Sequence, residues 1–349
     1  MEYIRKKVSY VAKGSSILLA RDRQKFSRNQ LLRTTSEIWH NVTILRPILF
    51  LVILLVISGI LSPGFLSLGN MRTLLITAAP LMLITVGESL VVLTGMIDLG
   101  VQSVLAAAGV LAAILDLYSH LSAFEIVVIV VLFGAAVGLL NGILVTKFKI
   151  PSFIQTLGIY WAFRGVAMII SKGENIAPSG SAPFNFSGFA GELFHSIPMM
   201  IVISVVVVII VQWGVKSFAW GKNVYAVGGN EWAAKSAGIK VDRTKIAVFM
   251  ISGVLAATAG IVMTSWLQEA YAFTASGYSL EAIAAVVVGG IPFTGGYGSV
   301  AGAALGAIVI TLISDLVVLL GLSPEYNYIA VGAVLVIAGL QIAKQRIVK

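Results

Sequence analysis

The sequence contains no cysteine and few charged residues, and each shortage excludes a class of protein. Without cysteine the chain has no disulfide, no thiolate metal site and no cysteine nucleophile. Asp, Glu, Lys and Arg make up 11% of its 349 residues and hydrophobic residues make up 58%. A soluble domain carries about 25% charged residues, so a soluble fold of this length would have too little charge to cover its surface. The composition therefore predicts an all-α, polytopic integral membrane protein.

Sequence motifs that would bind ATP or perform hydrolysis are also missing. There is no G-x-x-x-x-G-K-[ST] loop to cradle the phosphates of ATP, and neither G-x-S-x-G nor H-E-x-x-H occurs. The three histidines, His40, His120 and His195, lie far apart in the sequence, so they are not expected to form a metal site. We therefore expect no catalytic residue, no cofactor and no metal in this chain, and a protein that moves a solute rather than converts one.

Ten apolar segments follow a basic N-terminal tail, which comprises residues 1–46. A helix needs about 20 residues to cross a bilayer, and the eighth segment is too short to cross unaided. It is expected to be a half-helix or one part of a broken helix, so the membrane domain, residues 47–343, is expected to hold about ten transmembrane helices and at least eight. The apolar segments are roughly 47–61, 74–94, 99–117, 124–145, 153–170, 197–215, 246–266, 280–290, 300–320 and 328–342.

Positive charge is concentrated on one predicted side of the membrane. The tail alone holds ten Lys and Arg against three acids, in a chain whose net charge is +9. If the N-terminus is cytoplasmic and the segments alternate, 21 of the 24 Lys and Arg fall inside, and only Arg72 and Lys172 fall outside. This positive-inside bias predicts a cytoplasmic C-terminus at 344–349, an internal segment at 216–245 and an external loop at 171–196. The tail is expected to lie near anionic lipid headgroups, and nucleic acid is not an expected partner.

Glycines recur at every fourth position in two segments, which places them along one face of each predicted helix. These glycines are Gly134, Gly138 and Gly142 in the first segment, and Gly298, Gly302 and Gly306 in the second. Such a pattern lets a neighbouring backbone approach closely. It predicts close helix packing, with a sliding seam for gating as the alternative.

Two short interruptions break the apolar sequence, at 95–100 and at 289–298. They follow similar runs, 91–95 and 286–290, which indicates a weak internal repeat and a pseudo-repeated arrangement of two halves. Irregular backbone at membrane depth is tolerated only where it is buried in protein or lines a cavity. Paired interruptions of this kind point to a translocation path; two tight turns at the cytoplasmic interface are the alternative.

Several polar residues fall inside apolar segments, where a charge at the helix centre costs about 2.5–3.5 kcal/mol on insertion scales. Glu88 and Arg164 could form a structural ion pair, or either could line a polar path for a hydroxylated solute, and Glu88 could instead couple transport to protons. The other polar residues at such positions are Asn141, Gln155, Thr156 and Asp315.

The internal segment contains a predicted short helix with defined ends. Asn230 is a favourable N-cap after a Gly-Gly turn at 228–229, and Gly238 would stop a helix over 231–237. A capped helix on the cytoplasmic face of a chain without a nucleotide site suits docking onto a separate soluble motor subunit. A purely structural interfacial helix is the alternative.

The run from Gly221 to Ile239, GKNVYAVGGNEWAAKSAGI, resembles the cytoplasmic coupling segment of sugar-type ABC importer permeases. These permeases form the ribose/galactose/xylose group of the branched-chain amino-acid and sugar permease superfamily. The resemblance covers about Leu45 to Lys344, and one departure is Gly100, where the family often has serine. Further matching stretches occur in the family's order at 65–70, 95–100, 141–142, 151–158, 164–165, 280–290 and 295–298.

The resemblance implies a permease subunit that imports a monosaccharide-like solute across the cell (inner) membrane. Its implied partners are ATP-binding cassette ATPase subunits, an extracytoplasmic solute-binding protein, and a second permease copy or a sister permease in the lipid bilayer. ATP and Mg would be bound by the ATPase subunit and not by this chain. A permease for an amino acid or a nucleoside is one alternative. An ion-coupled secondary sugar transporter, with Glu88 or Asp98 as its coupling carboxylate, is another.

Polarity and the resemblance together assign residues to two roles. The residues expected to couple the chain to the ATPase are Gly228, Gly229, Asn230, Glu231, Ala233, Ala234 and Gly238. The residues expected to line the substrate path are Gly95, Asp98, Asn141, Phe153, Gln155, Thr156, Arg164, Glu281, Phe293, Thr294, Gly295 and Gly296.

Overall fold

The computed structural model describes the backbone of residues 45–62, 64–178, 183–193, 197–323 and 325–347, and side chains up to residue 336. The predicted basic tail, except for its last two residues, lies outside the described part of the chain, as do His195 and the last two residues of the predicted C-terminal segment.

Helices make up most of the described structure, which confirms the predicted all-α class. One 3₁₀ helix, η1 (Asn185–Ala190), and one antiparallel pair of two-residue strands, β1 (Glu192–Leu193) and β2 (Ile197–Pro198), accompany them. The α-helices are Leu45–Leu61, α2 (Leu68–Leu93), α3 (Val101–Tyr118), α4 (Ala123–Lys147), α5 (Ser152–Ser171), α6 (Met199–Ser217), α7 (Ala219–Gly229), α8 (Glu231–Ser236), α9 (Val241–Leu267), α10 (Tyr278–Val288), α11 (Val300–Leu319) and α12 (Tyr326–Ile347).

Ten of these helices coincide with the ten predicted apolar segments. Seven helices in the described part are long and apolar enough to cross a membrane by length and composition, and three apolar helices are shorter: Leu45–Leu61, α10 and the start of α12. As expected, α10 is too short to cross alone, with 11 residues. The number of membrane crossings stays a prediction.

One helix within the predicted internal segment was missed. Helix α7 is rich in glycine, which disfavours helix, and it is stabilised by its packing, because Gly221, Val224 and Val227 are buried. The residue pair 228–229, which we expected to form a turn, is instead the last part of this helix. The change of direction occurs one residue later, at Asn230.

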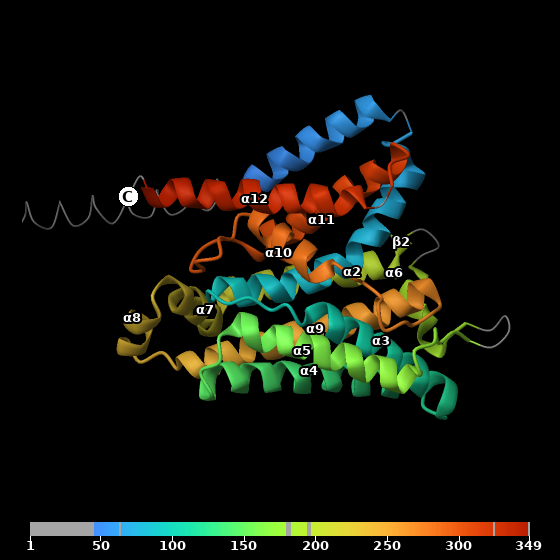
Figure 1. The fold of residues 1–349 in the computed structure, drawn as a ribbon, viewed down its shortest axis with the longest axis horizontal. Helices are drawn as coiled ribbons and strands as arrows, with labels where there is room; N and C mark the ends of the chain where they lie inside the picture. The colour runs from blue at the N-terminus through green and yellow to red at the C-terminus, as the bar shows by residue number, and fades with distance from the viewer. Residues whose placement is uncertain (1–44, 63, 179–182, 194–196, 324, 348–349) are drawn as a thin grey trace, which may run out of the picture.

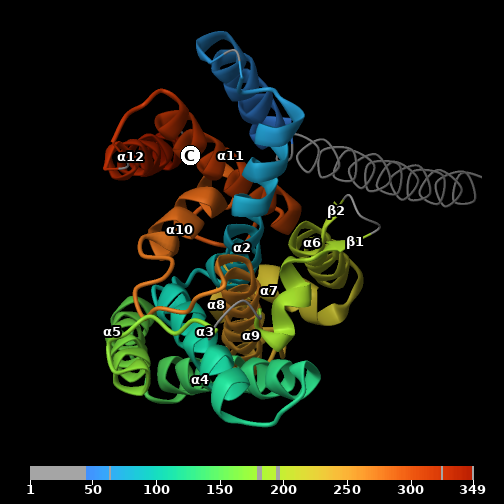
Figure 2. The same ribbon diagram turned by 90° about the vertical axis from the view of Figure 1, so that its right-hand side faces the viewer.

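The core is built around α2 and α9, most of whose residues are buried. Figures 1 and 2 both show these two helices between α4 and α5 on one side and α11 and α12 on the other. Helices α7 and α8 lie together at one end of the bundle, and the strand pair lies at the other end (Figure 1).

The segment predicted as an external loop, 171–196, is ordered where the structure describes it. The side chain of Ser265, near the end of α9, donates to the backbone oxygens of Phe186 and Ser187 and accepts from Ala190. Helix η1 therefore packs as a cap against α9. Its location outside the membrane stays a prediction.

The glycine patterns mark two close helix contacts, as predicted. A Cβ added at Gly134 or Gly138 of α4 would collide with backbone atoms of α9, and one added at Gly302 or Gly306 of α11 would collide with the backbone of α10. Gly298 does not belong to this helix face, because it lies before α11 with φ +124°.

We expect Gly138→Ala to lower the thermal unfolding temperature of the detergent-solubilised protein. The new methyl group would lie 2.7 Å from Met250 Cα, with backbone rather than a flexible side chain in its way; overpacking of this kind costs about 1–3 kcal/mol. Gly214→Ala on α6 is the control, because its Cβ would lie 4.0 Å from the Phe218 ring. Equal unfolding temperatures for the two variants would contradict the packing of α4 against α9.

Candidate functional site

Helices α2 and α10 end in the same hydrogen-bond pattern. Gly95 and Gly290 both have positive φ, +78° and +93°. Gly95 N donates to Val92 O at 2.9 Å and the next N–H returns to Val91 O, and the same two bonds recur at 287 and 286 in α10. This is the Schellman motif, in which glycine takes the left-handed conformation that ends a helix. The weak repeat in the sequence is therefore a repeated helix end.

The end of α2 and the α10–α11 connection meet the end of α7 in a contact that we call the glycine knot, comprising residues 93–95, 225–229 and 294–298. Gly296 N donates to Leu93 O at 2.9 Å, which joins the α10–α11 connection to the end of α2. A Cβ at Gly228 would overlap Leu93 O and would lie 2.6 Å from Gly296 N, so α7 touches both segments through bare backbone. Three segments far apart in the sequence are thus packed without intervening side chains.

Tyr225 adds a side-chain bond to the knot. Its hydroxyl donates to Gly298 O at 2.9 Å. Burial raises the pKa of the Tyr225 phenol above its ordinary value, so the hydroxyl keeps the proton that it donates. Helix α7 is therefore fixed to the α10–α11 connection at two places.

Beyond the knot, the α2–α3 connection turns inward around Asp98, which is buried. One carboxylate oxygen accepts from Gly100 N at 2.9 Å and the other accepts from Ser252 Oγ of α9 at 3.4 Å. The Asp98 N–H donates to Glu88 Oε1 of α2 at 3.1 Å. Asp98 therefore links the α2–α3 connection, which we call the break, to α9 and to α2.

Helix α5 closes the other side of this break. Its buried Thr156 accepts from Leu99 N at 3.0 Å, and Ser152 accepts from Ile97 N at 3.3 Å. Side-chain hydroxyls of α5 thus satisfy backbone groups that the broken helix leaves free.

Among the other predicted path residues, Asn141 and Gln155 are brought together. The side chain of Gln155 donates to the Asn141 side chain at 3.5 Å. Phe153, in contrast, is 52% exposed and points away from the core. Glu281 lies apart from this group and accepts from Asn327 at 3.2 Å. Asp315, also predicted from its polarity, accepts from Asn70 at 2.9 Å.

The predicted ion pair between Glu88 and Arg164 is not formed. Arg164 is buried and donates to Ser276 at 3.3 Å, and its guanidinium lies over the rings of Phe273 and Tyr160, 4.6 and 5.0 Å from their centres. These contacts tie α5 to the connection before α10. The pairing failed as a prediction because the partners of a single intramembrane charge depend on which helices become neighbours.

Of the predicted coupling residues, Gly228 and Gly229 end α7, and the others belong to the short helix α8 and its two ends. Asn230 caps it, with Oδ1 accepting from Ala233 N at 2.9 Å, and Ala234 is buried beneath it. Gly238, with φ +84°, reverses the chain after the helix, as predicted. Glu231 pairs with Lys245 of α9 at 2.8 Å.

One exposed aromatic residue was missed by the sequence analysis. Trp232 of α8 is 78% exposed. An exposed tryptophan is typical of a hot spot in a protein–protein interface. Its place within a short capped helix was the available signal.

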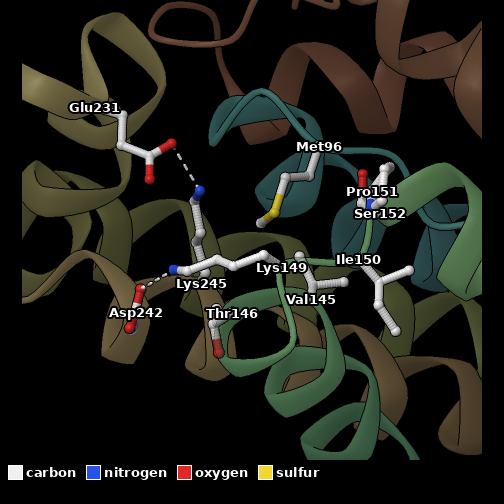
Figure 3. Close-up of a pocket in the computed structure, with 10 residues that line it drawn as sticks. All are labelled: Met96, Val145, Thr146, Lys149, Ile150, Pro151, Ser152, Glu231, Asp242 and Lys245. Carbon is white, nitrogen blue, oxygen red and sulfur yellow. Dashed lines mark hydrogen bonds and ion pairs between the residues drawn. The ribbon is translucent and has the colours of Figure 1, made fainter.

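A cavity of about 300 Å³ lies between α8, α9 and the α4–α5 connection (Figure 3). Its rim carries charged pairs: Lys245 with Glu231, and Lys149 with Asp242 at 3.7 Å. Met96, which follows the end of α2, lines it as well. The cavity therefore lies between α8 and the connection from α2 to α3. In the described residues, no group of three His, Cys, Asp or Glu could hold a metal ion.

Comparison with known proteins gives a family and several relatives. Residues 70–339 match the family model described as branched-chain amino acid transport system / permease component. The chain is 36% identical over 296 residues to the ribose import permease protein RbsC of Haemophilus influenzae, covering 84% of this chain and 91% of the relative. It is 32% identical over 308 residues to the L-arabinose ABC transporter permease protein AraH of Azospirillum brasilense, covering 88% and 90%. It is 32% identical over 289 residues to the D-allose transport system permease protein AlsC of Escherichia coli, covering 82% and 88%. No solved structure matches.

The two adjacent glycines at the end of α7 give a matched test of the knot. We expect Gly228→Ala to lower the unfolding temperature, because its methyl group would collide with backbone on two segments, at a cost of about 1–3 kcal/mol. A Cβ at Gly229 meets nothing within 4 Å, so Gly229→Ala should unfold near the wild-type temperature. Equal effects of the two substitutions in a thermal melt would contradict the contact.

Proposed function

The chain belongs to the branched-chain amino acid transport system / permease component family, and on that premise we propose that it is the permease subunit of an ABC importer that carries a monosaccharide into the cytoplasm. The names of its relatives support the solute class, since they carry ribose, L-arabinose and D-allose. The observation that carries the mechanism is the glycine knot, which joins the end of α7, next to the predicted docking helix, to the end of α2 and to the α10–α11 connection.

A separate subunit hydrolyses ATP in this proposal. The sequence has no phosphate-cradling loop, and α8 offers a capped helix with an exposed tryptophan. The ATPase subunit binds α8. When the ATPase subunit moves, it displaces α8 and α7, and α7 displaces the knot. From there the movement reaches the end of α2, the α10–α11 connection and the Asp98 break.

The solute path runs along α5 and is closed by a second permease. The core around α2 and α9 is filled by side chains. Helix α5, in contrast, has one exposed face, which a second permease could cover. That face carries Phe153 and Trp161, which are 52% and 64% exposed, and Gly158, which has open space beside it. Aromatic rings next to small residues suit a sugar, whose ring faces are apolar and whose edges bear hydroxyls.

The orientation places α7, α8 and both termini in the cytoplasm of a cell whose inner membrane holds the protein. Lys147, Lys149, Lys222 and Lys245 support it, because they lie at the end of the bundle that carries the docking helix, as the positive-inside rule requires. An extracytoplasmic solute-binding protein would deliver the sugar to the opposite end, where η1 packs as a cap.

The proposal predicts ATP-dependent uptake in reconstituted vesicles. The vesicles would hold this chain, the ATPase subunit and the binding protein expressed from neighbouring genes, and radiolabelled ribose, L-arabinose and D-allose would be offered in turn. Uptake of one of these sugars should require enclosed ATP and should survive a protonophore. Uptake that persists without ATP and collapses with the protonophore would identify an ion-coupled transporter. Uptake of an amino acid or a nucleoside instead of sugars would contradict the solute class.

A second prediction tests the docking helix. Trp232→Ala should weaken binding of the ATPase subunit roughly 30-fold, because truncation of an aromatic anchor costs about 2 kcal/mol or more. Binding would be measured by biolayer interferometry on the detergent-solubilised permease. Trp213→Ala is the matched control: Trp213 is 59% exposed, but it lies on the apolar helix α6. The assignment fails if both variants bind like the wild type or if both weaken binding equally.

A further inference from the structure

Two carboxyl groups are buried next to each other at the break between α2 and α3. Glu88 of α2 is 0% exposed, and Asp98 of the following connection is 3% exposed. The Asp98 N–H donates to Glu88 Oε1 at 3.1 Å, so the two residues are in direct contact. The ion pairs of the described residues involve Glu192, Asp242 and Glu231, and none of them includes either buried carboxyl group.

The charged groups on the surrounding helices are engaged elsewhere or exposed. From α5, Arg164 contacts Ser276 and two aromatic rings. The helices packed against α2 carry the following titratable groups: Asp116 bonded to Asn185, exposed Tyr118, exposed Lys216 and Lys222, Tyr225 bonded to Gly298, Asp242 and Lys245 in ion pairs, exposed Arg243, half-buried Tyr278, Glu281 bonded to Asn327, and Asp315 bonded to Asn70. No described cation therefore neutralises the pair.

The hydrogen bonds around the two groups differ. Asp98 accepts from Gly100 N and from Ser252 Oγ, and it precedes the first turn of α3, where free N–H groups favour a negative charge. Glu88 accepts only through Oε1, and its Oε2 is buried without a partner. Thr85, one turn earlier on the same helix, also has a buried hydroxyl without a partner.

Two adjacent negative charges that are buried from solvent and have no cation beside them are strongly unfavourable. A proton on Glu88 Oε2 removes one of the two charges. It also turns an oxygen that has no hydrogen-bond donor beside it into a hydroxyl that can donate. Thr85 Oγ1 and the carbonyl groups of the preceding turn of α2 lie on the side of the helix that this hydroxyl can reach. The environment of Asp98, in contrast, favours its ionised form.

We propose that Glu88 is a proton-binding site, which keeps one proton at neutral pH while the neighbouring Asp98 is ionised. The neutral carboxyl group accepts the Asp98 N–H and holds the break against α2 without opposing the Asp98 charge. Loss of the proton places two like charges in contact and loosens the α2–α3 connection. The proton is a resident ligand of the break, and the inference does not depend on which solute the protein carries.

Infrared spectroscopy of the purified chain in lipid nanodiscs tests this proposal. The wild type should show the C=O stretching band of a protonated, buried carboxylic acid at neutral pH. Glu88→Gln should abolish the band, whereas Asp98→Asn and the distant control Asp116→Asn should keep it. Absence of the band from the wild type, or its loss only in Asp98→Asn, would overturn the proposal. A sodium ion in place of the proton would also overturn it, and would show as a missing band together with an unfolding temperature raised by NaCl but not by KCl.

The pH dependence of the unfolding temperature gives a second, independent test of the proton on Glu88. The folded protein holds a proton that the unfolded chain releases at neutral pH, so raising the pH should lower the unfolding temperature of the wild type. In Glu88→Gln the unfolding temperature should fall less steeply with pH, because this variant releases one proton fewer on unfolding. If this variant does not fold, titration of the wild-type band to alkaline pH replaces it. A band that does not disappear as the unfolding temperature falls would contradict the site.

Discussion

The arrangement depends on one contact, in which the backbone of Gly228 lies directly against Leu93 and Gly296. No side chain separates these segments, and the Gly296 N–H donates to Leu93 O at 2.9 Å. Flexible side chains could absorb a displacement of α7 by changing rotamer, but packed backbone cannot. A displacement of α7 would therefore also displace the end of α2 and the α10–α11 connection, because α7 has no room to move alone.

The other features of the site follow from how the ends of α2 and α10 are formed. Each ends in a Schellman motif at a glycine, and the chain after Gly95 then turns inward to Asp98. The buried pair Glu88–Asp98 holds this turn from one side, and Thr156 of α5 holds it from the other. The docking helix, the knot and the proposed sugar path along α5 thus form one continuous series of contacts.

Local sequence signals predicted many of the helices, their ends and their closely packed faces. Hydropathy located ten apolar helices, glycine spacing marked the closely packed faces of α4 and α11 without naming their partners, and Asn230 and Gly238 marked the ends of α8. The misses have a common cause, which is long-range packing. Helix α7 is rich in glycine and is stabilised by its packing, and Arg164 contacts Ser276 and two aromatic rings rather than Glu88. That Gly228 and Gly296 meet could not be read from either segment alone.

The most direct test is whether the knot moves as one body. The chain has no cysteine, so spin labels can be placed on Lys222→Cys in α7 and on Thr294→Cys in the α10–α11 segment of the knot, both at exposed positions. Electron–electron double resonance would measure their separation in the complex with the ATPase subunit, without nucleotide and with trapped ATP. The account predicts an unchanged separation, while the distance from Lys222→Cys to Lys172→Cys at the far end changes. A nucleotide-dependent change between positions 222 and 294 would contradict it.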